Sequence, residues 1–163
     1  VWKRFQGRVP PRFMNEELCH RNMAFSLYQA DQMPLVRMGE TEVERIGGNV
    51  FRVFVDIANP KVTPTVMARA AQNFTVRPDL LLVDGKGIEV IAASFIDNKS
   101  VYRANPSVTP LVDQKDLKRI IVRNGHPGKT TRTAVLIVKG SGAVKVTYDS
   151  VKGGKASKTV TLK

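Results

Sequence analysis

The sequence predicts a mainly β protein: an antiparallel β-sandwich of the immunoglobulin or fibronectin type, preceded by one N-terminal α-helix. Three observations support this fold class. Residues 35–163 alternate apolar with polar positions and are rich in β-branched residues, as half-buried strands are. Turn signals recur there at short spacing and end in two consecutive hairpins. No helical pattern alternates with the strands, which argues against a parallel α/β sheet.

The first expected element is an irregular entry segment over residues 1–13, in which two adjacent prolines oppose a helix. A helix should follow from an N-cap at Asn15 to Met33, because Pro34 cannot continue it. We therefore divide the chain into residues 1–34, the entry loop and helix, and residues 35–163, the β-sandwich.

The expected helix has no clean polar face. At about 100° per residue its apolar side chains fall on two roughly opposite sides, and a single sheet covers only one side of a helix. We therefore expect contact with another domain, although loops of the same domain could cover the second side, and a dimer could form through the helix. The side chains expected in this contact are Leu18, Met23, Phe25, Leu27 and Tyr28. The chain starts at Val1 without a secretory leader, so we expect it to be the tail of a longer polypeptide.

The strands are expected from alternation and from glycine-rich turns. Gly47-Gly48-Asn49 is a hairpin signal between strands near residues 36–46 and 49–59. Further strands are expected near 65–75, 79–84 and 87–96, followed by a looser segment from Asp97 to Pro110. The last third has the clearest pattern, with strands over Leu117–Arg123, Thr130–Lys139, Ala143–Asp149 and Ser157–Leu162.

The basic surplus of the chain is concentrated at its end. The net charge is +12, and residues 114–163 carry twelve basic and two acidic side chains. The lysines there stand at strand ends, turns and alternate positions. Tyr148 is the only Phe, Trp or Tyr residue in this segment. This pattern is typical of soluble strand exteriors and protected sheet edges rather than of a nucleic-acid interface. The apolar runs are far too short for a membrane span.

The residues that could carry chemistry do not form a catalytic set. Cys19 lies on an apolar stripe of the helix and is interpreted as a buried, inert thiol. His20 is adjacent to it and points about 100° away. His126 lies in a Gly/Pro turn, where we expect exposure to solvent. Two histidines and one cysteine do not predict a zinc site or an internal disulfide.

Two acidic motifs are better explained by structure than by ligand binding. Asp84-Gly85-Lys86-Gly87 is only faintly similar to a phosphate loop and is interpreted as a turn. Glu40, Glu42 and Glu44 share one face of an alternating segment. They could bind calcium if loops supplied more oxygens, but strand spacing favours a solvated face. The sequence thus predicts no catalytic, cofactor-binding or metal-ligating residue.

A series of short motifs follows in a fixed order along nearly the whole chain. They are Arg8-Val9-Pro10-Pro11, Glu17-Leu18-Cys19, Asn22 with Phe25 and Leu27, Met33-Pro34, Phe51-Arg52-Val53, Ile57 with Asn59, Thr63-Pro64-Thr65, Val138-Lys139-Gly140, Gly142-Ala143-Val144, Gly153-Gly154, and Val160 with Leu162. In this order they resemble the C-terminal region of a family of bacterial zinc carboxypeptidases. The chain departs from the family at Leu136, where its members tend to have a bulky aromatic residue.

This resemblance implies a noncatalytic role. Residues 1–34 would be the end of a catalytic domain, and residues 35–163 an accessory or stabilising β-sandwich. The zinc, its ligands and the general base would belong to the preceding part of the same polypeptide, which would cleave C-terminal residues from peptides. The alternative is an independent module that binds a glycan, a protein or an anionic surface, with Trp2 and Tyr102 as candidate exposed aromatics. The lone cysteine leaves the compartment open, with secretion or the periplasm slightly favoured.

Overall fold

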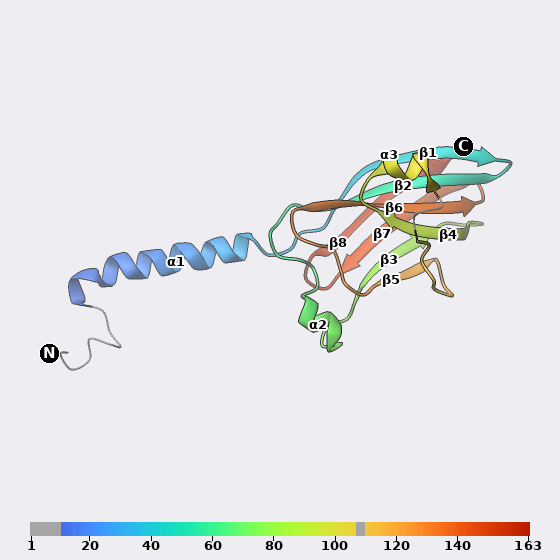
Figure 1. Cartoon of the computed structure of the whole chain (residues 1–163). Helices are drawn as coiled ribbons and strands as arrows, with labels where there is room; N and C mark the ends of the chain where they lie inside the picture. The colour runs from blue at the N-terminus through green and yellow to red at the C-terminus, as the bar shows by residue number, and fades with distance from the viewer. Residues whose placement is uncertain (1–10, 107–109) are drawn as a thin grey trace. The chain divides into compact units, whose positions relative to one another are not determined.

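The computed structural model describes residues 11–106 and 110–163 (Figure 1). Contacts divide the chain into two compact units, Val1–Gln32 and Met33–Lys163. The first unit contains a short 3-10 helix, η1 (Arg12–Met14), and α1 (Asn15–Asp31). The second contains β1 (Arg37–Gly47), β2 (Val50–Asn59), α2 (Ala68–Gln72), β3 (Asp79–Asp84), β4 (Glu89–Ile96), α3 (Lys99–Ala104), β5 (Arg119–Val122), β6 (Thr130–Lys139), β7 (Gly142–Ser150) and β8 (Gly154–Leu162).

The strands form two four-stranded antiparallel sheets, with the orders β1-β2-β6-β4 and β5-β3-β7-β8. The predicted mainly β fold with one N-terminal helix is therefore confirmed. Alternate residues of each strand face the core between the sheets, as the period of two requires. The buried side chains on these inner faces include Phe51, Val53, Val55, Ile57, Leu136, Leu81, Val83, Val146 and Tyr148.

A second, smaller core lies on the outer face of the first sheet. Phe54 and Val135, which are paired across β2 and β6, are buried there together with Ile96 and Tyr102. The rings of Phe54 and Tyr102 meet edge to face, with 6.0 Å between centroids. The expected exposure of Tyr102 was therefore wrong, because α3 returns over this face and carries Tyr102 inward. Asn98 caps α3 through its side-chain oxygen, which accepts from the backbone N–H groups of Ser100 and Val101.

Three local expectations differ from the structure. The strand expected near residues 65–75 is absent, and Ala68–Gln72 forms α2 instead because its residues are good helix formers. The looser segment from Asp97 to Pro110 contains α3. Asn15 is the first residue of α1 rather than its cap, because η1 precedes it and Met14 takes the cap position. Most of the entry segment expected over residues 1–13, with Trp2, lies outside the described residues.

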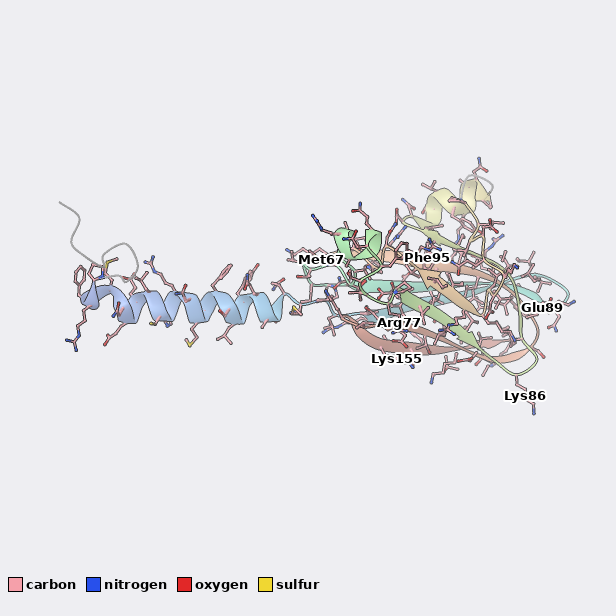
Figure 2. The ribbon with its side chains drawn as sticks, turned by 90° about the horizontal axis from the view of Figure 1, so that it is seen from below. Met67, Arg77, Lys86, Glu89, Phe95 and Lys155 are labelled. Atoms are coloured by element: carbon pink, nitrogen blue, oxygen red, sulfur yellow. The ribbon has the colours of Figure 1, made fainter. Side chains whose placement is uncertain are left out.

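The two ends of the sandwich differ in their loops. The far end carries the tight glycine turns between β1 and β2, β3 and β4, and β6 and β7. The other end, which we call the α2 end, carries α2 beside the start of β3 (Figure 1). The chain also enters the sandwich there, since the Val36 N–H donates to the carbonyl of Gly153 across 2.8 Å. Met67 and Lys86 mark the opposite ends in Figure 2.

Candidate functional site

Helix α1, described by itself, presents large apolar side chains to its surroundings. Four of the five predicted contact residues are more than half exposed: Met23 at 54%, Phe25 at 60%, Leu27 at 63% and Tyr28 at 59%. Leu18, the fifth, is partly buried. Among the described residues of this unit, only η1 lies beside the helix, and no residue of α1 is buried. Residues 11–32 therefore offer these side chains little apolar cover.

The same helix exposes its two potentially reactive side chains. Cys19 is exposed as a free cysteine, and His20 beside it is exposed as well. The expectation that Cys19 is buried was wrong, because none of residues 11–32 covers that side of the helix.

A buried polar cluster lies at the α2 end, below the main core. The carboxylate of Asp79 is completely buried, and its Oδ2 accepts hydrogen bonds from the hydroxyls of Thr65 and, across 3.0 Å, Tyr148. Its Oδ1 has no partner among the described residues. Burial, followed by the neighbouring Asp79 carboxylate, raises the pKa of Tyr148 above its ordinary value of 10.0. The cluster therefore holds Tyr148 in its neutral, donating form.

His126 belongs to this cluster and is only 3% exposed. Its Nε2 lies 2.8 Å from the carbonyl oxygen of Ile57, and its Nδ1 lies 3.0 Å from that of Pro127. Its ring also meets the ring of Tyr148 edge to face. The expected exposure of His126 was wrong, because the Gly/Pro turn folds back onto the core and brings the ring with it.

The cluster is arranged for structure rather than for catalysis. A general base needs a nitrogen free to take a proton from a nucleophile, and both ring nitrogens of His126 face backbone carbonyls. The backbone N–H of His126 donates to the Thr65 hydroxyl across 2.6 Å. Gly125 permits this approach, since a Cβ at that position would lie 2.5 Å from Thr65 Oγ1. The contacts thus fasten two loops of the α2 end to each other.

A charged cluster covers the outer face of the first sheet. Lys99 of α3 bridges Glu42 across 2.9 Å and Asp56 across 3.0 Å, while Arg103 pairs with Glu42 across 2.7 Å and Glu44 across 2.6 Å. Hydrogen bonds from Lys99 and Arg103 lower the pKa of Glu42. The expectation of a solvated glutamate face is correct for exposed Glu40. Glu42 and Glu44 are partly exposed as well, and α3 adds the cations that pair with them.

These pairings leave no metal-binding arrangement within the described part of the chain. No group of three or more His, Cys, Asp and Glu side chains could hold a metal ion there. The turn from Asp84 to Gly87 joins β3 to β4, as interpreted from the sequence. We therefore assign no zinc ligand to the described residues.

The α2 end also carries the concave apolar surface of the sandwich that sequence analysis missed. A pocket of about 510 Å³ lies between α2 and the loop after β5, and a smaller one of about 180 Å³ adjoins it. Phe74, Ala71 and Arg123 line both, so we treat them as one site, the α2 pocket. Pro64, Val66 and Pro127 line the larger part, and Val76 and Ile121 line the smaller. Its walls come from residues 64–78 and 121–127, which are distant in sequence.

Comparison with known proteins gives one result. A family model described as "Domain of unknown function (DUF8731)" matches residues 35–161, most of the chain. No curated protein and no solved structure matches the chain significantly. Across the described ranges, no helix is both long enough and apolar enough to cross a membrane.

Proposed function

The chain belongs to the family of domains of unknown function DUF8731, and we propose that it serves as the noncatalytic accessory and stabilising part of a zinc carboxypeptidase. In this proposal α1 packs against the catalytic domain that precedes it in the same polypeptide. The catalytic domain would hold the zinc and remove C-terminal residues from peptides. The sandwich would stabilise that domain and shape access to it.

The observation that carries this proposal is the apolar surface of α1. Burying a large apolar side chain stabilises a fold by about 1.5–3 kcal/mol, and Met23, Phe25, Leu27 and Tyr28 are all more than half exposed. An isolated helix of this length is also marginal in water. A domain packed against α1 would explain both its apolar composition and its stability.

The arrangement of the described polar residues supports a noncatalytic role. The set most similar to a catalytic constellation is Asp79, His126 and Tyr148. Asp79 Oδ2, the Tyr148 hydroxyl and both ring nitrogens of His126 face partners inside the fold. Cys19 and His20 are both exposed on α1. The carboxypeptidase identity itself rests on the order of motifs that resembles that family.

The experiment uses the complete reading frame that contains this chain. We expect zinc-dependent release of C-terminal residues from peptides, and a double substitution of Phe25 and Leu27 by serine should lower the Tm of the enzyme by several degrees. Ile91→Ser, at a position of β4 that is 49% exposed, is the matched control and should leave the Tm nearly unchanged. An upstream sequence without a metal-binding motif would refute the enzyme assignment. An unchanged Tm in the double variant would refute the role of α1.

A second candidate function, an independent protein-binding module, is favoured by the α2 pocket. A glycan-binding role has less support, since Tyr102 is buried in the second core and Trp2 lies outside the described residues.

A further inference from the structure

Phe74 has a conformation that costs the fold free energy. Its φ is +52°, in the left-handed region, where a bulky residue is strained by about 1–2 kcal/mol. The residue is 75% exposed, so burial in the sandwich does not compensate for the strain. A strained, exposed aromatic residue that forms the wall between the two parts of the α2 pocket is better explained by binding than by folding.

The segments that build the α2 end carry only one sign of charge. Residues 60–78 and 117–130 contain no Asp or Glu. Their basic side chains are Lys61, Arg69, Arg77, Lys118, Arg119, Arg123 and Lys129. Arg77 pairs with Asp149 across 3.0 Å, but within the described residues the side chains of Arg69 and Arg123 have no hydrogen-bond or ion-pair partner. Arg123 is thus an available cation on the wall of an apolar pocket.

We propose that the α2 pocket binds an acidic polypeptide segment of a partner protein. A large aliphatic or aromatic side chain of that segment enters the pocket against Phe74. An adjacent Asp or Glu of the segment pairs with Arg123, and further carboxylates lie near Arg69. The positive charge of the surrounding loops steers such a segment toward the pocket and disfavours basic segments. This inference does not depend on the carboxypeptidase proposal.

The shape of the site favours a polypeptide over an anionic membrane. A loop that inserts into lipid presents apolar side chains on a protruding tip, whereas the side chains here enclose a concavity of about 510 Å³. That volume is within the usual range for a site that receives a bound group. Apolar anchors that fill pockets, with charged groups at the rim, are the common pattern of protein hot spots.

The test measures binding of fluorescein-labelled hexapeptides to the whole chain by fluorescence anisotropy. The probe has two glutamates, leucine, tryptophan and two further glutamates. One control peptide replaces the four glutamates by lysine, and another replaces leucine and tryptophan by serine. We expect saturable binding of the first peptide alone, weakened by salt because exposed ion pairs are screened.

Two matched pairs of variants locate the binding. Arg123→Glu should weaken it at least about fivefold, whereas Lys86→Glu, the same charge change at the far end, should change it less than about twofold. Phe74→Ala should weaken it similarly, and Ile91→Ala should not. Equal losses in Arg123→Glu and Lys86→Glu, or no saturable binding of the acidic peptide, would overturn the proposal. A third outcome would also overturn the proposal. If the protein bound no peptide but cosedimented with vesicles of equimolar phosphatidylglycerol and phosphatidylcholine, and this needed Phe74, the ligand would be a membrane.

Discussion

At the scale of a single residue, Phe74 lowers the stability of the fold through backbone strain and forms a wall of the proposed binding pocket. Because glycine adopts a positive φ without strain, Phe74→Gly should raise the free energy of unfolding by about 0.5–1 kcal/mol. The same substitution removes the wall of the α2 pocket and should abolish binding of the acidic peptide. Urea denaturation and anisotropy measure the two effects separately. A variant that loses stability and keeps its affinity would assign Phe74 to the core instead.

Tyr148 gives a second residue-level prediction, in alkaline solution. Its pKa is raised above 10.0 in the folded protein, so above about pH 10 the unfolded chain binds fewer protons than the native one. The contribution of Tyr148 to the free energy of unfolding should therefore be fully present below pH 10. It should fall as the pH rises further, by at most about 1.4 kcal/mol per pH unit. Urea unfolding at about pH 9 and about pH 11 should show a larger loss for the natural protein than for Tyr148→Phe. Parallel pH profiles would contradict the prediction.

At the scale of elements, α3 is held to the first sheet by charge as well as by packing. Lys99 lies between Glu42 and Asp56, and Lys99→Ala should lower the free energy of unfolding by about 1 kcal/mol at neutral pH. The lowered pKa of Glu42 means that its contribution is present above its unfolded pKa and is lost as the pH falls through the folded one.

Thermal unfolding at neutral pH and at about pH 3 checks this prediction. The difference in Tm between the natural protein and Lys99→Ala should shrink in acid, because protonation of Glu42 removes its attraction to Lys99. Lys86→Ala, at an exposed turn, is the control and should change Tm little at either pH. A difference that is constant with pH would show that Lys99 stabilises α3 by packing alone.

The strands were predictable where the local signals were strong. The strand over Thr130–Lys139 was predicted with its observed bounds, since it alternates cleanly and ends at glycine. The short helices were missed, because six or fewer residues give no helical period. Missing α3 also hid the second core, in which Phe54 is buried.

The candidate sites were likewise predictable only where a local sequence pattern was strong. The apolar residues of α1 were predictable, because the pattern belongs to one continuous helix. His126 and Tyr102 were placed wrongly, since turn chemistry and local sequence do not tell which loops fold back onto the core. The α2 pocket joins segments about fifty residues apart, which no local pattern indicates. The one signal available was the absence of acidic residues from both segments.

At the scale of the whole molecule, the sandwich should fold without the helical unit. Both hydrophobic cores lie entirely within residues 33–163. Deleting residues 1–32 should therefore leave a cooperative unfolding transition, and the Tm of the sandwich should change by only a few degrees. Calorimetry measures this transition, and sedimentation velocity should show less self-association in the shortened chain because the apolar side chains of α1 are gone. A shortened chain without cooperative unfolding would contradict the division into two units.

The C-terminus and the α2 pocket lie at opposite ends of the sandwich, which has a practical consequence. Strand β8 runs from the α2 end at Gly154 to Leu162, which pairs with Gly142 beside the far-end turn. A biotin attached after Lys163 would therefore tether the protein by the end remote from Phe74 and Arg123. On a sensor surface the molecules would stand in a single orientation, with the pocket directed toward the flowing solution and clear of the support.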